Sequence, residues 1–359
     1  MKCLERYTYR ELLGPVLFSV IAFTLIFVAA DLLFMLARLL VEGSVGLGTI
    51  IRLFVLGLPR VVALTLPMST LLGILLCYST LSASSEIVAM RAAGVSLARI
   101  MAPALIVSLV ISGMAFAFNE KVVPGANRRF EEIMWQIGKK SNPFIQRNLV
   151  LKEFEKGSLS RLVFAGSYDE TEELFRQVTV QEFEEGRLCR ITEAARAKWD
   201  NAAWWFEDGI SYNVVDGDRM VSVRFARQEG CMAYTPAEVA RGALSPDEMS
   251  ALELGQYIRM LKEQGAATRK LSVEYYLKFA IPFASLVFGL VAAPLGIRTH
   301  RASTSLGFGM SILIIFVYYV IMSLSCAFAE RGSISPMLGA WFSNMLFGAI
   351  GGWMIMKKS

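Results

Sequence analysis

The sequence contains a single histidine, His300, and few charged residues. Asp, Glu, Lys and Arg make up 19% of the 359 residues, against about 25% in an average soluble domain. One histidine excludes a metal centre that uses several imidazole ligands. Five scattered cysteines without CxxC spacing give neither a thiolate metal site nor a disulfide framework. We therefore expect no metal and no cofactor.

The motifs of nucleotide hydrolysis and of common hydrolases are also missing. The stretch Gly138–Ser141, GKKS, lacks the upstream glycine of a phosphate-binding loop, and no GxGxxG, HExxH or GxSxG pattern occurs. Charged residues are nearly absent from the middle of the apolar runs, which argues against an ion or proton relay across a membrane. The chain is predicted to be non-catalytic, so a partner would supply the energy for any transport.

Hydrophobic residues, in contrast, make up 55% of the sequence, and the mean hydropathy is +0.48. They gather in six long runs, each long enough to cross the ~30 Å hydrocarbon core of a bilayer as a helix. The pattern therefore predicts an α-helical membrane protein. Its predicted spans are Leu12–Ala37, Leu53–Ala83, Ile100–Phe118, Val273–Pro294, Ser303–Phe328 and Ser335–Met356.

Basic residues gather on one side of this arrangement. Lys2, Arg6 and Arg10 precede the first span, and Lys357–Lys358 follow the last. Because cytoplasmic segments of membrane proteins are rich in Lys and Arg, both termini are predicted to be cytoplasmic. Three crossings then place the central part of the chain outside the cytoplasm. The expected domains are residues 1–120 with three spans, residues 121–269 outside the membrane and residues 270–359 with three more spans.

The central part of the chain has the alternation of a β domain. Apolar and polar residues alternate in Arg176–Phe183 and Arg219–Arg227, which is typical of strands with one buried face. Pro246–Lys262 has the spacing of a short amphipathic helix that leads back to the membrane. We expect an antiparallel sheet whose turns are marked by Glu185-Gly186, Asp208-Gly209 and Asp216-Gly217.

Ser82–Arg99 lies between the second and third spans and is too short and too polar to cross a bilayer. Glu86 and Arg91 make the segment wettable, while Ile87 and Met90 give it an apolar side. Gly94 is expected to interrupt it. We predict a short helix at the cytoplasmic membrane surface.

Four stretches resemble one known family, the LptF/LptG (YjgP/YjgQ) lipopolysaccharide export permeases. They are LTLPMSTLLGILL at Leu64–Leu76, SSEIVAMRAAGVS at Ser84–Ser96, APLGIR at Ala293–Arg298 and SLGFG at Ser305–Gly309. The second of them is the most specific and favours the LptF-like of the two paralogues. The resemblance covers essentially the whole chain, including the layout of three spans, an external β domain and three spans.

The resemblance implies a bacterial inner-membrane protein whose β domain is a jellyroll-like periplasmic domain inserted between helices 3 and 4. It implies a permease subunit that extracts lipopolysaccharide from the membrane with energy from ATP. The implied partners are a cytoplasmic ATPase dimer (LptB-like), a second permease paralogue and periplasmic bridge proteins (LptC/LptA-like), with no nucleic acid. Two other classes stay open: a membrane-anchored assembly or sensor module, and a secondary transporter.

In this scheme Ser82–Arg99 is the coupling helix, and Glu86 pairs with a basic residue of the ATPase. Without the family motif, Glu86 would be a solvated surface charge of little energetic value. Arg91 lies about 140° further round a helix and points elsewhere. The residues expected to couple to the ATPase are Ser84, Ser85, Glu86, Ile87, Met90, Arg91 and Gly94.

Asp31 and Arg38 are seven residues apart, so a regular helix places them on nearly one face at the outer end of the first span. They would contact a lipid headgroup that carries phosphates, or they would only anchor the span at the interface. The same two interpretations apply to Arg52, Arg60 and Lys278. The resemblance also implies that the first span and the span after the external domain form a lateral gate for lipid.

Two features of the external domain have a structural and a functional interpretation. Cys189 and Cys231 lie where a disulfide is chemically permitted, but two lone cysteines in strands are more often unpaired. Trp199 and the stretch Trp204–Phe206 are expected in the core of the sheet. The alternative is that these aromatic rings contact an acyl chain in an apolar groove.

Overall fold

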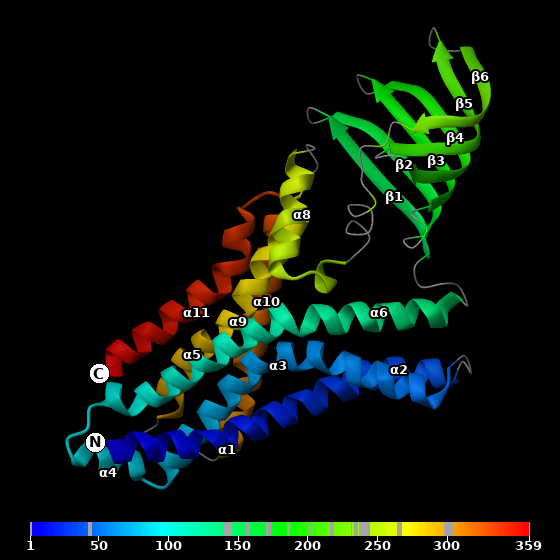
Figure 1. Cartoon of the computed structure of the whole chain (residues 1–359). Coiled ribbons are helices and arrows are strands. Elements are labelled where there is room, and N and C mark those ends of the chain that lie inside the picture. Colours follow the sequence, from blue (N-terminus) through cyan, green and yellow to red (C-terminus); the bar gives the residue numbers. More distant parts are fainter. Residues whose placement is uncertain are drawn as a thin grey trace. The chain divides into compact units, whose positions relative to one another are not determined.

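The chain folds into two units in the computed structural model (Figure 1). One unit comprises Met1–Phe130 with Arg269–Ser359, and the other comprises Glu131–Thr268. The structure describes residues 2–41, 45–139, 145–155, 158–169, 172, 174–184, 187–200, 203–215, 219–230, 232, 236, 245–263, 268–297 and 304–358.

Among its described residues, the first unit contains six helices long and apolar enough to cross a membrane, which confirms the predicted number of spans. Most predicted limits lie within a few residues of the observed helix ends, and the first helix begins earlier because its apolar run is preceded by a polar helical segment. The helices that carry the spans are α1 (Lys2–Phe27) with the π-helical turn η1 (Val28–Leu32) and α2 (Leu33–Val41), α3 (Leu47–Ala83), α5 (Leu97–Lys121), α9 (Arg269–Gly296), α10 (Thr304–Glu330) and α11 (Pro336–Lys358).

Helix α9 forms the middle of this unit and packs against α3, α5 and α11, while α3 also packs against α1. In the most apolar stretch of α3 and of α9, 67% of the residues are buried, against 22% for the first span and for α10. Small residues allow the close packing: a Cβ added at Gly73 of α3 would lie 2.6 Å from the Val16 Cα of α1. The unit therefore has a dense centre and two largely exposed helices.

Helix α6 (Val123–Lys139) follows α5 and continues past Phe130, where this part of the first unit ends. Among its described residues, the second unit contains one six-stranded antiparallel sheet with the strands in chain order. This confirms a β insert between the third and fourth spans. The strands are β1 (Ile145–Glu155), β2 (Ser158–Asp169), β3 (Leu174–Glu184), β4 (Arg187–Asp200), β5 (Ala203–Val215) and β6 (Arg219–Gly230).

One face of the sheet carries its hydrophobic core, which includes Phe175, Val178, Trp204 and Phe206. The Trp199 and Trp204 rings meet edge to face with centroids 5.2 Å apart. The expected core position of this aromatic stretch is thus confirmed for Trp204 and Phe206. Trp205 alternates to the other face, where the Arg227 guanidinium lies 4.5 Å from its ring centroid.

A line of irregular residues crosses all six strands. In each strand, the regular pairing skips one residue at this line. Between β2 and β3, for example, Ala165 lies opposite Val178 and Ser167 lies opposite Arg176, and the pairing skips the residues between them. Phe175 and Val178 are three positions apart and would lie on opposite faces of a regular strand. Because one skipped residue lies between them, both are buried on the same face. We call this line the crease; its residues are Asn148, Gly166, Gln177, Ala195, Asp208 and Ala226.

The crease explains why the prediction of a turn at Asp208-Gly209 is wrong. These residues lie inside β5, where Asp208 has a φ of 52° and Gly209 packs so closely on Phe225 that a Cβ would overlap its ring. An Asp-Gly pair is enriched in turns because both residues tolerate left-handed backbone, and a kinked strand uses the same property. The other expected turns, Glu185-Gly186 and Asp216-Gly217, fall between strands but outside the described residues.

After the sheet, the short 3-10 helix η2 (Pro246–Glu248) and α8 (Ala251–Glu263) confirm the predicted amphipathic segment. Ser250 starts α8 with a capping box: its Oγ accepts the Glu253 N–H at 3.2 Å, and Glu253 Oε2 accepts the Ser250 N–H at 2.8 Å. Cys189 is a free thiol, as expected. Cys231 and His300 lie outside the described residues.

Candidate functional site

The predicted coupling segment is a seven-residue helix, α4 (Glu86–Ala92), bounded by two left-handed residues. Ser85 has a φ of 62° and separates α4 from α3, and Gly94 has a φ of 82° and separates it from α5. The Val95 N–H donates to the Met90 carbonyl at 3.1 Å and the Gly94 N–H to the Arg91 carbonyl at 2.9 Å. This is a Schellman motif, which favours glycine at position 94. The expected interruption at Gly94 is confirmed.

Ile87 and Met90 of this helix face inward. Ile87 is 3% and Met90 is 9% exposed, and both belong to the main hydrophobic core of the membrane unit. They therefore anchor α4 to the rest of the chain. Ser84, Ser85, Arg91 and Gly94 lie on the exposed side. Val88, which no sequence pattern singled out, joins them with 60% of its surface exposed.

Glu86 is half-buried at the start of α4, and both of its carboxylate oxygens accept hydrogen bonds. The Tyr7 hydroxyl of α1 donates to Oε2 at 2.9 Å, and the Ser84 Oγ donates to Oε1 at 2.9 Å. Tyr7 was not a candidate in the sequence, because no local pattern relates a residue to one 79 positions away. The carboxylate is thus held in a defined orientation at the protein surface.

Both matched motifs of the C-terminal half meet α3 just before this segment. Ser82 Oγ donates to the Gly296 carbonyl at 3.2 Å. A Cβ added at Gly296 would lie 2.6 Å from the Tyr78 Cβ, and one added at Gly307 would lie 2.8 Å from the Leu75 Cδ2. The glycines of APLGIR and SLGFG therefore let α9 and α10 approach the last turns of α3. Three of the four matched stretches converge at one place.

The candidate substrate residues are spread along the spans. Asp31 lies in the π-helical turn η1, and both Asp31 and Arg38 are exposed, away from the buried Val28, Leu32 and Leu36. A π-helical turn widens the helix locally and often occurs at functional sites. The remaining three candidates are Arg52 and Arg60, both exposed on α3, and Lys278, half-buried on α9.

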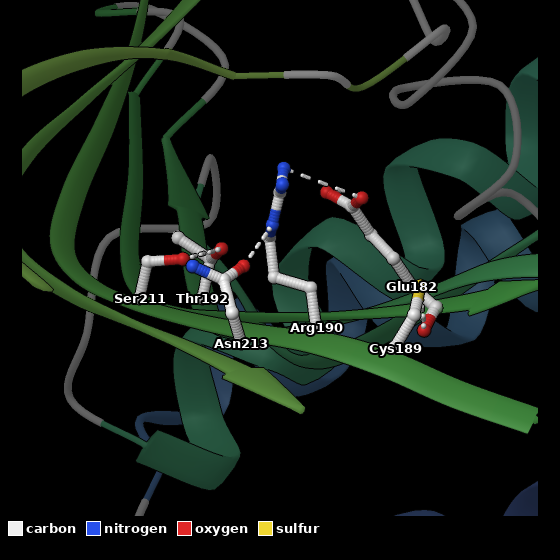
Figure 2. Close-up of polar contacts among 6 residues, drawn as sticks. All are labelled: Glu182, Cys189, Arg190, Thr192, Ser211 and Asn213. Atoms are coloured by element: carbon white, nitrogen blue, oxygen red, sulfur yellow. Dashed lines mark hydrogen bonds and ion pairs between the residues drawn. The ribbon is translucent and has the colours of Figure 1, made fainter. Parts of the chain in front are cut away.

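The sheet carries a polar group, which Figure 2 shows. It lies on the same face as the apolar core, because Arg190, Thr192 and the core residue Ala194 are two positions apart along β4. The Arg190 Nε donates to the Asn213 Oδ1 at 2.7 Å, and Arg190 Nη1 lies 3.7 Å from the Glu182 Oε2. In the next row, the Thr192 and Ser211 hydroxyls lie 3.4 Å apart and are buried. The face thus changes from apolar to polar toward the hairpin between β3 and β4, a gradient that the alternation of single strands did not reveal.

Over the described part of the chain, no group of three or more His, Cys, Asp or Glu side chains is placed to hold a metal ion. The polar groups of the described residues link helices, link strands of the sheet or lie at the surface.

Comparison with known proteins gives one family. The family model described as lipopolysaccharide export system permease LptF/LptG matches residues 6–357. LptG of Escherichia coli K12 is 24% identical over 332 residues, which cover 85% of this chain and 84% of the relative. LptF of the same organism is 22% identical over 359 residues, covering 96% and 92%. LptG of Haemophilus influenzae Rd is 21% identical over 363 residues, covering 99% and 98%.

These identities are too similar to separate the two paralogues, so the expected likeness to LptF stays a prediction. The family match, however, spans nearly the whole chain and includes both membrane halves and the sheet. The chain therefore belongs to the LptF/LptG family of lipopolysaccharide export system permeases.

Proposed function

We propose that this permease works as a subunit of an ATP-driven lipopolysaccharide exporter and that a separate cytoplasmic ATPase dimer binds it at α4. The observation that carries the proposal is the build of α4: a short exposed helix, anchored by Ile87 and Met90 and presenting an oriented Glu86. Such a helix moves as one piece with the spans on either side of it. It can therefore transmit closure of the ATPase dimer to the membrane.

A basic residue of the ATPase would form an ion pair with Glu86. Because Glu86 is already half-buried, docking would remove its remaining water, and a desolvated pair of this kind contributes more to specificity than an exposed one. Val88 offers an apolar contact beside it. Arg91 is exposed on a different side, where it adds to the excess of basic residues that is typical of cytoplasmic segments.

The second permease and the lipid path belong to the exposed helices. The first span and α10 are each only 22% buried in their most apolar stretch, so their surfaces are available to lipid or to a partner helix. Because α9 is largely buried and α10 is largely exposed, we propose that α10 rather than α9 forms the second side of the lateral gate. Arg38 and Arg52 would then contact lipid phosphates, since guanidinium groups bind phosphate in a bidentate manner.

We further propose that the sheet lies in the periplasm, with both termini in the cytoplasm, and that its apolar face receives acyl chains. Val221 and Val223 of β6 are exposed and share a face with the buried core residues Val163 and Val180. Among the described strands, β1 and β6 are the edges of the sheet, and an edge strand can be extended by strands of a bridge protein of the LptC/LptA kind. Lipid would then pass along the apolar part of this face, beside the polar group of Glu182, Arg190 and Asn213.

The experiment is co-purification of the tagged chain from native membranes in mild detergent, followed by mass spectrometry. We expect a second six-span permease and an ATPase with the wild-type chain, and loss of the ATPase alone with Glu86→Lys. Arg91→Glu, which also reverses one charge on α4, serves as the matched control and is expected to retain it. Recovery of the wild-type chain without any ATPase would refute ATP coupling and favour an assembly or sensor module.

A further inference from the structure

Within the described part of the chain, the hydrogen bond that links Glu86 to another helix comes from the first span. The Tyr7 hydroxyl donates to Glu86 Oε2 at 2.9 Å, across 79 positions in the chain. The hydrogen bond from Ser84 joins neighbours two positions apart and cannot transmit movement between helices. Tyr7 is therefore the polar link between α1 and the start of α4.

Helix α1 is well suited to carry a displacement of Tyr7 into the membrane. It is attached to α3 by the hydrogen bond between Ser69 Oγ and the Ser19 carbonyl at 3.2 Å and by the contact of the Thr24 and Thr65 hydroxyls at 3.2 Å. Leu12 is almost fully buried about one and a half turns beyond Tyr7. The same helix then continues into η1 and the exposed outer part of the span.

Tyr7 contributes little to the fold itself. Its side chain is 40% exposed, and a hydrogen bond at a solvated surface adds little net stability because water replaces it when it breaks. A contact with weak structural value and a well-defined geometry at the coupling carboxylate points to a role in orientation.

We infer that Tyr7 is a positioning residue that orients Glu86 and couples α4 to the first span. This inference rests on the proposed function, in which Glu86 meets a basic residue of an ATPase. The approach of that cation has one of two effects on the hydrogen bond from Tyr7 to Glu86 Oε2. The bond stays and fixes the orientation of Glu86 in the ion pair, or it breaks and releases the N-terminal end of α1. Both events connect ATPase docking to the lipid-facing span.

The first test reads the contact directly in the full-length chain. 3-Fluorotyrosine is introduced at position 7, and the ¹⁹F spectrum is compared with and without Glu86→Gln. We expect the resonance to shift when the charged acceptor is removed and to stay unchanged in the control Arg91→Gln, which leaves the acceptor in place. An unchanged resonance in Glu86→Gln would refute the inference without any bearing on transport.

The second test uses the purified complex of this chain with the co-purifying ATPase and permease. Tyr7→Phe is expected to leave the thermal stability of the chain unchanged and to lower the lipopolysaccharide released per ATP at least about threefold. Tyr9→Phe, on the same helix about 200° away, is the matched control and should match the wild type. Tyr7→Phe should add nothing to Glu86→Ala, because each substitution removes the same hydrogen bond.

The outcomes separate the two proposals. A normal ratio of lipid to ATP in Tyr7→Phe, with a fluorine shift in Glu86→Gln, would refute the role of Tyr7 and leave ATP coupling intact. Retention of the ATPase by Glu86→Lys would refute the proposed docking at Glu86, and the inference with it.

Discussion

Gly289 of α9 lies directly against Ser108 of α5, so closely that a Cβ on the glycine would overlap the serine side chain. Ser108 has little freedom to move, because its Oγ donates to the Ala104 carbonyl at 2.6 Å. The contact joins the third and fourth spans, which the chain separates by the whole β domain. It is one of the points at which the two membrane halves become a single unit.

Gly289→Ala should therefore destabilise the membrane unit by about 1–3 kcal/mol, the usual cost of adding a methyl group to a filled interface. The measurement is thermal unfolding in detergent, followed by tryptophan fluorescence. Ser108→Gly in the same chain should restore part of the loss, because it removes the overlapping atoms. Gly113→Ala, at a helical glycine with no atom within 4 Å of a new Cβ, is the control and should cause no loss.

Gly94→Ala should weaken the end of α4 by about 1 kcal/mol through backbone strain alone. No atom lies within 4 Å of a Cβ at this position, so steric overlap plays no part. Hydrogen exchange of the Gly94 and Val95 amides, which close the Schellman motif, should become faster. Gly94→Asn should be milder, because asparagine tolerates left-handed backbone. Equal protection in the alanine variant and the wild type would contradict the assignment.

The buried group of Tyr318, Asn344 and the Ala280 carbonyl should hold α9, α10 and α11 together. The Tyr318 hydroxyl donates to Asn344 Oδ1 at 2.9 Å, and the Asn344 Nδ2 donates to the Ala280 carbonyl at 2.9 Å. Asn344→Leu is expected to cost about 1 kcal/mol, typical of interhelical hydrogen bonds in membranes. Tyr318→Phe should cost less, since it spares the bond to Ala280. A double-mutant cycle on thermal stability measures the coupling, and additive losses would speak against it.

Cys189 should react slowly with thiol reagents at neutral pH. Burial, and then the nearby carboxylates of Glu184 and Glu182, raise the pKa of its thiol, so a smaller fraction is the reactive thiolate at any given pH. The rate of alkylation by iodoacetamide should keep rising above the pH at which a free cysteine levels off. Glu182→Gln removes one negative charge and should increase the rate at pH 8; an unchanged rate would contradict this cause.

The layout of the membrane unit could be predicted because each span depends on its own composition. Six apolar runs suffice for the number of spans, and the exposed, glycine-terminated helix at Glu86–Ala92 follows from local signals such as Gly94. Contacts between distant parts could not be predicted in this way. Nothing near Tyr7 in the sequence indicates Glu86, and nothing near Gly307 indicates Leu75.

The wrong turn at Asp208-Gly209 has the same origin. A dipeptide reports which backbone angles are permitted, whereas the neighbouring strands decide whether those angles reverse the chain or only bend it. Gly209 lies beside Phe225 in the folded sheet, and that contact exists only after β5 and β6 have paired.

The crease restricts how the sheet can change in evolution. Its irregular residues stand opposite one another on all six strands, from Asn148 to Ala226. A residue inserted in one strand between the crease and a hairpin would turn every side chain beyond it to the opposite face, unless a β-bulge absorbs it. The described strands have two such register shifts, between Glu153 and Phe154 of β1 and between Glu182 and Phe183 of β3, and both lie between the crease and a hairpin. Changes in strand length are therefore expected at these two places rather than at the crease.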